Sequence, residues 1–522
     1  MNRFDIIVIG GGLNSLVTAS MLGKAGKKVL VFEARDQVGG LASTSVFAPG
    51  FKCNVINDVV KWIDPRVMKQ FNLESHGLEL HSLDTVRIAL DTQGQHIVFH
   101  RNPNETAGSI ANRSEKDAKV WKQFTEYIDK LTHFLEKLYE LTPPKLPNIG
   151  LKEAFSMRSM LSPIRKHGTR GLVDFMRVAP MMMPELVDEW FENELLRAAI
   201  STAGIHHLSF GPFAAATGLN LLHQHVHSKG VFHNVQFVKG GTSELANAVK
   251  LSAESVNVEI RTNSKVSAIN VENGVCNGVT LESGETIQAD QVVSGLDPQN
   301  TFIKLVGPSK LNPTFATQLR NIKYRGSTAR IHFALNGLPK INGIQEDQMG
   351  TIFSASPSIE YLERTSDSVK YGRVAENPYV EFTIPSVINP EFSPEGKHVL
   401  SASVQYAPYH LRGMNWSEEL KSQLKNNVVS VLENYIPNFS SMIESSSLLT
   451  PVDLESQFGL TEGNLNHGEM TLDQFMFMRP TISTAQYKSP IENLYLCGPG
   501  THPGGGLHGA NGFNAAKEIL KR

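Results

Sequence analysis

Three consecutive glycines beginning at Gly10 follow a short β-branched run, 5–9, near the start of the chain. A helical pattern comes next, and then a second strand pattern over 28–32 that ends in Glu33. In such a strand–turn–helix–strand unit, Gly10 permits the tight turn, and Gly12 lets the backbone approach a pyrophosphate at the positive end of the helix. Glu33 can accept hydrogen bonds from a ribose 2′-hydroxyl and would repel a 2′-phosphate. The spacing therefore predicts a site for FAD or NAD, and not for NADP.

The predicted helix begins at Leu13 and Asn14, and Ser15 stands where the dinucleotide fingerprint has its third glycine. Serine is small enough to keep the helix close to the strand. We therefore expect these three residues to border the nucleotide together with Gly10 and Gly12.

A paired glycine follows Glu33 after a short polar stretch, which suits a loop that wraps the pyrophosphate from its other side. The stretch resembles the ExRxxxGG segment of glutathione-reductase-type FAD proteins, and this resemblance implies FAD as the cofactor. Leu41 stands where the amine-oxidase and phytoene-desaturase branches often have an arginine, so one phosphate or flavin contact is missing. The residues of this stretch predicted to bind FAD are Ala34, Arg35, Gly39, Gly40 and Leu41.

A second glycine-rich segment lies close to the C-terminus, between a strand pattern at 494–497 and a helical pattern that begins at about Asn514. Glycines at a strand–helix junction leave backbone N–H groups free to face an anion or a polarised carbonyl. A flavin offers both, in its phosphates and in its N1–C2=O2 edge. The residues predicted to bind FAD here are Gly498, Gly500, Gly505, Gly506, Leu507 and His508.

The sequence NLYLCGPGTHPGGGLHGANGFNAA, which begins at Asn493, resembles the C-terminal signature of the phytoene desaturase family of carotenoid oxidoreductases. Segments 463–480 and 188–200 are similar to segments of a sister branch, typified by pyridine nucleotide-disulphide oxidoreductase domain-containing protein 2. The resemblance covers essentially the whole chain. It implies an α/β fold: a glutathione-reductase-type Rossmann FAD domain with an inserted α+β substrate lobe.

The resemblance also implies a division of the chain into five segments. The middle of the chain fits it, because strand patterns on either side of Val266 lead back to a parallel sheet,. In the family this part completes the FAD domain, and the backbone near Val266 is expected to meet the adenine. FAD-binding segments are predicted at 1–110, 231–305 and 476–522, a helical part of the substrate lobe at 111–230, and a part with an antiparallel sheet at 306–475.

The leading hypothesis for function is an FAD-dependent desaturase or dehydrogenase. An apolar isoprenoid or lipid-like substrate would give a hydride to flavin N5 while a neighbouring carbon loses a proton. Quinone or oxygen would then accept the electrons. The candidate catalytic residues, all in the family-like stretch 463–480, are His467, Asp473, Gln474 and Arg479.

Two alternatives stay open. One is an amine-oxidase-like flavoenzyme, which a tightly lined aromatic cage at the flavin would favour. The other is a non-catalytic flavin- or prenyl-lipid-binding protein, against which the retained glycines argue. The sequence leaves open the substrate, the direction of the reaction, the electron acceptor and the oligomeric state.

Residues 156–184 carry five basic side chains and one acidic side chain, Asp174, among methionines and other large apolar residues. This composition is typical of a solvated basic helix beside a methionine-rich core. It also fits a surface that lies on anionic lipid. The chain shows neither a signal peptide nor an apolar run long enough to span a membrane. We therefore expect a cytoplasmic protein, with membrane contact through 156–184 as a further hypothesis.

The amino-acid composition disfavours several classes of function. The 522 residues include 49 Lys and Arg against 51 Asp and Glu, which disfavours a globally basic nucleic-acid binder,. The three cysteines form no CxxC pair, so a thiol-redox motif and a cysteine zinc site are both disfavoured,. The histidines between His206 and His227 lack a neighbouring carboxylate or cysteine cluster. We expect them to lie at the surface or in a pocket, and we predict no metal site.

Overall fold

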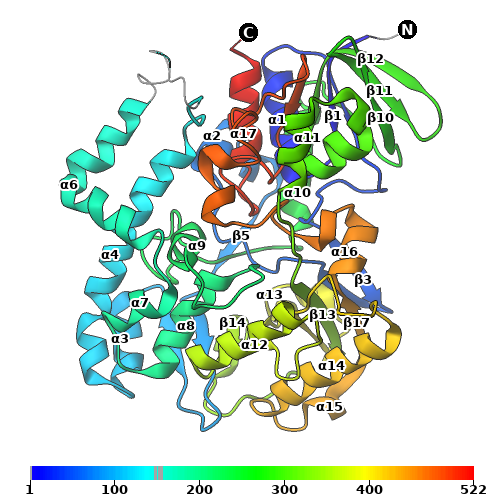
Figure 1. Ribbon diagram of the computed structural model, residues 1–522. Helices are drawn as coiled ribbons and strands as arrows, with labels where there is room; N and C mark the ends of the chain where they lie inside the picture. The colour runs from blue at the N-terminus through cyan, green and yellow to red at the C-terminus, as the bar shows by residue number, and fades with distance from the viewer. Residues whose placement is uncertain (1–2, 146–149, 151–156, 522) are drawn as a thin grey trace.

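The computed structural model describes residues 3–145, 150 and 157–521, and it is built around two large sheets (Figure 1). Five strands of the first sheet are parallel, in the spatial order β9, β2, β1, β12, β18. Two further strands continue it as an antiparallel ribbon beside β12. The strands are β1 (Phe4–Ile9), β2 (Val29–Phe32), β9 (Glu259–Arg261), β10 (Val266–Glu272), β11 (Val275–Leu281), β12 (Thr286–Ser294) and β18 (Leu494–Leu496).

Both ends of the chain meet in this first sheet, because β12 pairs with β1 on one side and with β18 on the other. Strand β2 is buried throughout and β1 at every residue but Asp5, and both are rich in β-branched residues, as expected of parallel strands covered on both faces,. Helix α1 (Leu13–Lys24) contacts both α10 (Ser243–Glu254) and the C-terminal helix α17 (Ala510–Ile519). Figure 1 shows the two termini at the same end of the molecule.

The second sheet is antiparallel except where β14 pairs with β6. Its order is β17, β13, β16, β15, β14, β6, β7. On one face Ile331 and Phe333 pack with residues of α14 (Glu418–Glu433) in an apolar core. The strands are β6 (Thr85–Ala89), β7 (Ile97–His100), β13 (Thr328–Leu335), β14 (Ile352–Ala355), β15 (Tyr379–Thr383), β16 (His398–Gln405) and β17 (Ile443–Leu449).

Strands β6 and β7 show that the predicted segment 1–110 contributes to both sheets. The parallel pairing of β6 with β14 could not be predicted from sequence, because parallel neighbours are joined by a long crossover and lie far apart in the chain,. The division into five segments stays a prediction. The remaining elements in the described chain include β3 (Thr44–Ala48), β4 (Phe51–Asn54), β5 (Leu80–Ser82), β8 (Gln236–Val238), α2 (Pro65–Phe71), α11 (Pro313–Arg320), α12 (Ile359–Tyr371), α13 (Pro385–Ile388), α15 (Phe439–Met442) and α16 (Pro451–Phe458).

A group of helices lies beside the second sheet, at the left in Figure 1. Ser114 caps the start of helix α4 (Glu115–Tyr139), because its Oγ accepts a hydrogen bond from the Asp117 N–H at 3.1 Å,. Its buried stripe includes Trp121 and Phe124 and packs into one large apolar core with the neighbouring helices. The other helices are α3 (Pro103–Ala111), α6 (Leu161–Val178), α7 (Met183–Asp188), α8 (Glu194–Ile205) and α9 (Thr217–Gln224).

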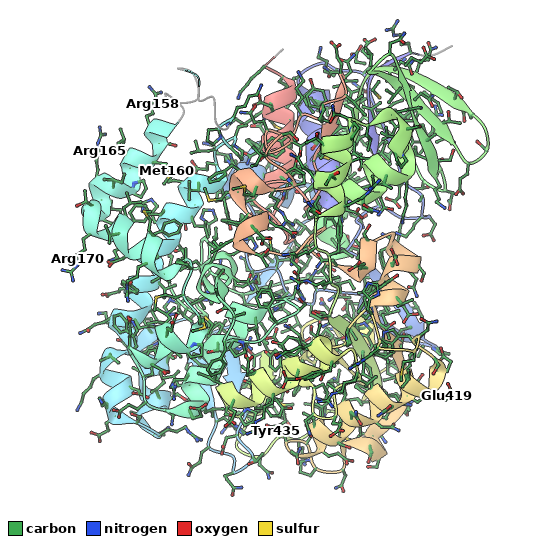
Figure 2. All side chains as sticks on the ribbon, viewed as in Figure 1. Arg158, Met160, Arg165, Arg170, Glu419 and Tyr435 are labelled. Atoms are coloured by element: carbon green, nitrogen blue, oxygen red, sulfur yellow. The ribbon has the colours of Figure 1, made fainter. Side chains whose placement is uncertain are left out.

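Helix α6 carries most of the predicted basic segment, of which residue 156 lies outside the described residues. Figure 2 shows Arg158, Arg165 and Arg170 projecting outward from the side of the molecule. Leu161, Val173 and Met176 are also exposed. Contact with a membrane surface stays a proposal. In the described part of the chain, no helix has both the length and the apolar character needed to cross a bilayer.

Candidate functional site

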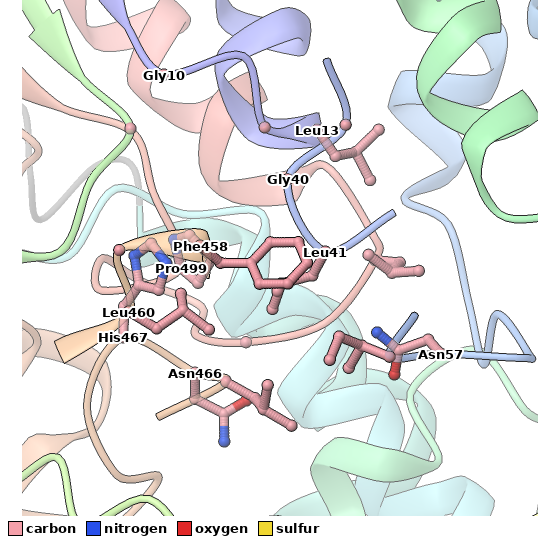
Figure 3. Close-up of a pocket in the computed structure, with 18 of the residues that line it drawn as sticks. Gly10, Leu13, Gly40, Leu41, Asn57, Phe458, Leu460, Asn466, His467 and Pro499 are labelled. Carbon is pink, nitrogen blue, oxygen red and sulfur yellow. The ribbon is translucent and has the colours of Figure 1, made fainter. Parts of the chain in front are cut away.

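A cavity of about 750 Å³ lies between the two sheets and is lined by the chain's first strand–helix turn, its C-terminal glycines and the second sheet,. Figure 3 shows Gly10 and Gly40 near its upper side and Asn466 and His467 across from them. The cavity therefore collects residues from both ends and the middle of the sequence, as expected of a site assembled from discontinuous segments.

Two glycine turns leave the start of α1 open to this cavity. Gly12 is the N-cap of α1 and supplies no capping side chain, so the first N–H groups of the helix can face a ligand,. A Cβ atom at Gly40 would lie 3.1 Å from the Gly12 Cα, and one at Gly39 would lie 2.4 Å from the Ala42 carbonyl oxygen. Both glycines also have positive φ. The close approach of the two turns therefore requires glycine, as the sequence predicts.

Glu33 holds these two turns together. Its Oε2 accepts a hydrogen bond from the Gly11 N–H at 2.6 Å, and its Oε1 accepts one from the Arg35 N–H at 2.9 Å. A carboxylate offers about four acceptor positions, so lone pairs remain for the hydroxyls of a ribose. Because Glu33 also lines the cavity, its place at the end of β2 matches the predicted role.

The serine at the third fingerprint position is accommodated by a glycine opposite. A Cβ atom at Gly295 would lie only 1.9 Å from Ser15 Oγ. Ser15 Oγ also lies 3.8 Å from Cys497 Sγ at the end of β18. The departure from the fingerprint is therefore matched by the missing side chain at Gly295, and the helix stays close to the sheet.

The C-terminal glycines bring α17 onto α1. A Cβ atom at Gly512 would lie 2.0 Å from the Asn14 carbonyl oxygen, so the two helix backbones touch at this point. Thr18 Oγ1 donates a hydrogen bond to the Gly512 carbonyl at 3.0 Å. The amino ends of both helices consequently face the same region, which suits an anionic nucleotide.

Most of the residues predicted to bind FAD line the cavity. Three do not: Gly498 packs against the Gly295 carbonyl, Gly500 lies against Pro298 and His467, and His508 stacks on Trp62 at a ring distance of 4.2 Å. The predicted residues that line it are Gly10, Gly12, Leu13, Asn14, Ser15, Glu33, Ala34, Arg35, Gly39, Gly40, Leu41, Val266, Gly505, Gly506 and Leu507. Glycine turns, two helix amino ends and the Glu33 carboxylate in one cavity fit FAD.

Of the four candidate catalytic residues, only His467 belongs to the described cavity lining. Asp473 is exposed and pairs with Lys323. Gln474 is buried and hydrogen-bonds the backbone of Lys323. These two side chains hold the 463–480 segment in place at a distance from the lining, so their contact with cofactor or substrate is not supported.

Arg479 also lies outside the lining, because its guanidinium is fully committed to the backbone. It donates hydrogen bonds to the carbonyl groups of Asn466, Gly468, Glu469, Gln474 and Pro499. Burial lowers its pKa to about 10. Arg479 therefore fixes the loop that carries His467 instead of reaching into the cavity.

His467 is a neutral histidine in the cavity wall. Burial lowers its pKa to about 4, although the nearby Asp297 acts in the opposite direction. Its Nδ1 is buried and has no hydrogen-bond partner within the described residues. A neutral imidazole with an unoccupied nitrogen can accept a proton or orient a polar ligand atom.

Sequence reasoning missed the charged far end of the cavity, which we call the polar wall: Asp58, Lys61, Arg330, Glu381, Thr383, Ser401 and Ser403. Arg330, Ser403 and Glu381 are direct neighbours across β13, β16 and β15. Arg330 forms a buried ion pair with Asp58, and Glu381 pairs with Arg87 at 2.7 Å. The available signal was the alternation in β13, where Arg330 and His332 interrupt an otherwise apolar buried strand.

Between the polar wall and the glycine turns lies an apolar belt, formed by Leu41, Ile56, Leu460 and Leu465. All four line the cavity and pack in one cluster. We call the part of the cavity lined by the glycine turns its nucleotide end. A bound molecule can therefore meet apolar surface beside the nucleotide end and charged side chains at the polar wall.

Histidines form part of the lining at the polar end. His206, His207 and His223 line the cavity, and burial lowers the pKa of both His207 and His223 to about 3. No group of three or more potential ligands in the described chain is arranged to hold a metal ion. These histidines act as neutral polar groups of the pocket.

Comparison with known proteins shows the family to which the chain belongs. The family model "Flavin containing amine oxidoreductase" matches residues 16–520. "Pyridine nucleotide-disulfide oxidoreductase domain-containing protein 2" of Rattus norvegicus is 30% identical, covering 99% of this chain and 94% of that protein. "Phytoene desaturase (lycopene-forming)" of Paracoccus sp. is 25% identical, covering 97% and 95%. The resemblance inferred from the sequence motifs is thus confirmed.

The fold agrees as well. The crystal structure of an oxidoreductase from Methanosarcina mazei aligns with a TM-score of 0.59 at 14% identity, covering 99% of this chain and 100% of that one. The predicted fold class and the FAD cofactor are confirmed by the family and by the architecture of the glycine turns. The chain belongs to the flavin containing amine oxidoreductase family, and it is an FAD-dependent oxidoreductase.

Proposed function

We propose that the protein is a dehydrogenase that removes two hydrogens from adjacent carbons of its substrate and leaves a C=C bond. The apolar belt carries this proposal, because it offers a C–H-rich segment a dry place beside the nucleotide end of the cavity. The name of one relative, a phytoene desaturase that is 25% identical to this chain, supports the same chemistry.

Bound FAD supplies the hydride acceptor, and quinone or oxygen takes the electrons afterwards. The chain's own part is to orient the substrate, exclude water and receive a proton. The belt residues Leu41 and Leu460 exclude water from the reacting carbons. His467 receives the proton from the second carbon, since its ring lines the cavity and is neutral at pH 7,.

Oxidation of an amine is the second candidate, because the family model carries that name. It is favoured less by the lining. The aromatic carbocycles in the described lining are Phe32, Trp62, Phe382 and Phe458, and no two of these four stack on each other. Trp62 instead stacks on His508 with its ring nearly parallel.

Anaerobic mixing of the holoprotein with matched compounds tests the proposal. Saturated and unsaturated isoprenoids, fatty acids and primary amines of equal chain length are each added while the visible flavin band is followed. We expect bleaching by a compound that has adjacent C–H bonds and no amine. Bleaching by amines alone would assign the protein to amine oxidation, and a yellow holoprotein that no compound bleaches would favour the non-catalytic alternative.

The variant His467→Gln sharpens the test. Glutamine keeps a polar side chain but cannot take up a proton, so we expect the rate of bleaching to fall by about 10²–10⁴-fold. The FAD content should be unchanged. Unaltered bleaching would remove His467 from the proposed reaction.

A further inference from the structure

The second sheet turns its charged face toward the cavity and its apolar face away from it. Arg330 alternates with Ile331 and Ala329 in β13, and the apolar members pack against α14. Across the sheet, Arg330 adjoins Ser403, and Ser403 adjoins Glu381. A binding site for a wholly apolar molecule would gain more from the opposite orientation, since polar groups lose hydration when such a ligand covers them.

Counted together with Arg87, which lies just outside it, the polar wall carries three cations, Lys61, Arg87 and Arg330, against two carboxylates. Asp58 pairs with Arg330 and Glu381 pairs with Arg87, whose side chain lines a small pocket that continues beyond Lys61. Lys61 is the remaining cation, and it donates a hydrogen bond to the Gln224 side-chain oxygen at 2.6 Å. Among the described residues Lys61 has no ion-pair partner, so this end of the cavity holds one uncompensated positive charge.

Polar atoms of the same wall are also left without partners. Thr383 Oγ1 and Arg330 Nε are buried, and neither has a hydrogen-bond partner in the described part of the chain. Both side chains line the cavity and are at least nine-tenths buried. Buried polar atoms without partners are costly, so the side chains of this wall do not satisfy all of its own polar groups.

We propose that the substrate carries a carboxylate, which the polar wall binds through Lys61 with Arg330 and Thr383 beside it, while an apolar segment lies against the belt. One uncompensated positive charge matches a monoanion, whereas a phosphate ester would bring a charge of about −1.5 to −2. An ammonium group would be repelled by Lys61. The substrate class is therefore an amphipathic carboxylic acid.

This inference rests on the proposed function only for the orientation of the apolar segment, and its test measures binding without turnover. Holoprotein is titrated with decanoate, methyl decanoate and decylammonium while the flavin spectrum is followed. A charge-assisted hydrogen bond changes affinity by about tenfold or more, so decanoate should bind at least that much more tightly than the other two. Equal affinity for acid and ester, or tighter binding of decylammonium, would overturn the proposal.

Variants of Lys61 locate the carboxylate. In Lys61→Met the affinity for decanoate should fall about tenfold or more while that for methyl decanoate stays the same. Lys61→Arg should restore most of the loss. Lys119→Met, a change of an exposed lysine on α4, is the matched control and should alter neither affinity. If Lys61→Met retains its FAD and binds decanoate as the unchanged protein does, Lys61 is not the anion site.

The two proposals fail in different ways. Lys61-dependent binding of decanoate without bleaching by any compound would leave the carboxylate site standing and remove the dehydrogenase reaction. Bleaching by a neutral hydrocarbon, unaffected by Lys61→Met, would support the dehydrogenase reaction and remove the carboxylate site.

Discussion

The two ends of the cavity differ in what forms them: closely packed backbone at one end and charged side chains at the other. At the nucleotide end the close contacts involve backbone atoms: a Cβ atom at Gly39 or at Gly512 would lie within 2.4 Å of a carbonyl oxygen, so neither position has room for a side chain. At the polar wall, charged side chains from separate strands meet, and Arg330 reaches Asp58 from 272 positions away in the sequence. Backbone geometry serves a cofactor of fixed structure, whereas side-chain charges can be exchanged for another substrate.

Because of this difference, we expect the two ends to tolerate substitutions differently. At the polar wall, changing both partners of an ion pair should be tolerated better than changing one. At the nucleotide end, a single methyl group should be harmful, because its obstacle is backbone that has no alternative position.

The largest effect is expected for Arg330→Met. It leaves the carboxylate of Asp58 buried without its partner, which should lower the free energy of unfolding by about 3–5 kcal/mol. The double variant Arg330→Met with Asp58→Leu removes both charges and should recover most of that loss. Urea denaturation of the holoproteins measures both. If the double variant is no more stable than the single one, the pair does not act as a unit.

A somewhat smaller loss is expected for Gly512→Ala. Its Cβ would lie 2.0 Å from the Asn14 carbonyl oxygen, so α17 must move off α1, at a cost of about 1–3 kcal/mol,. The FAD content, measured from the ratio of visible to ultraviolet absorbance, should fall as well. Gly108→Ala in α3 is the matched control, since a Cβ there meets nothing within 4 Å. It should raise stability by about 0.5–1 kcal/mol. Equal behaviour of the two variants would contradict the backbone contact.

Glu33→Gln tests the carboxylate that joins the two glycine turns. An amide can accept only one of the two hydrogen bonds that Gly11 and Arg35 now donate, and the unpaired N–H should cost about 1–3 kcal/mol,. Retention of FAD during gel filtration and the urea midpoint are the measurements. Full retention together with an unchanged midpoint would show that the carboxylate charge is not needed there.

The nucleotide end was largely predictable from sequence for the same reason that it resists mutation. Glycine spacing encodes local backbone geometry, so Gly10, Gly12, Gly39 and Gly40 could be assigned from short motifs,. The replacement of a glycine by Ser15 could be noticed, but its compensation by Gly295 depends on a contact across the sheet.

The polar wall could not be predicted in this way. Lys61, Arg330 and Glu381 belong to no motif, and their meeting depends on strand register between distant segments,. The family-like segment 463–480 suggested Asp473 and Arg479 as catalytic candidates beside His467. In the structure their side chains hold a loop in place, and only His467 lines the cavity. The prediction of an apolar isoprenoid or lipid-like substrate came from the family resemblance, and no motif indicated the charged residues of the polar wall.

The smallest predicted effect is the pH dependence of the affinity for decanoate, which should come from the polar wall and not from the nucleotide end. Burial lowers the pKa of Lys61 to about 8, with Arg87 acting in the same direction and Glu381 opposing it. Lys61 is therefore charged below that pH and loses its charge as the pH rises through it. The affinity for decanoate should be constant from about pH 6 to 7 and should fall as the pH passes 8, by up to about tenfold per unit.

Other groups that face Lys61 should not produce this change. Glu381 and Arg87 keep their charges, because the pKa of the first is lowered and that of the second is raised. Burial keeps the pKa of His206, His207 and His225 far below neutral, so they stay uncharged. Asp58 and Arg330 are two further charged residues of the polar wall, and they form an ion pair with each other. In Lys61→Met the profile should be flat, and in Lys61→Arg the fall at pH 8 should disappear because guanidinium stays protonated. A profile that falls at the same pH in all three proteins would assign the titration to the nucleotide end instead.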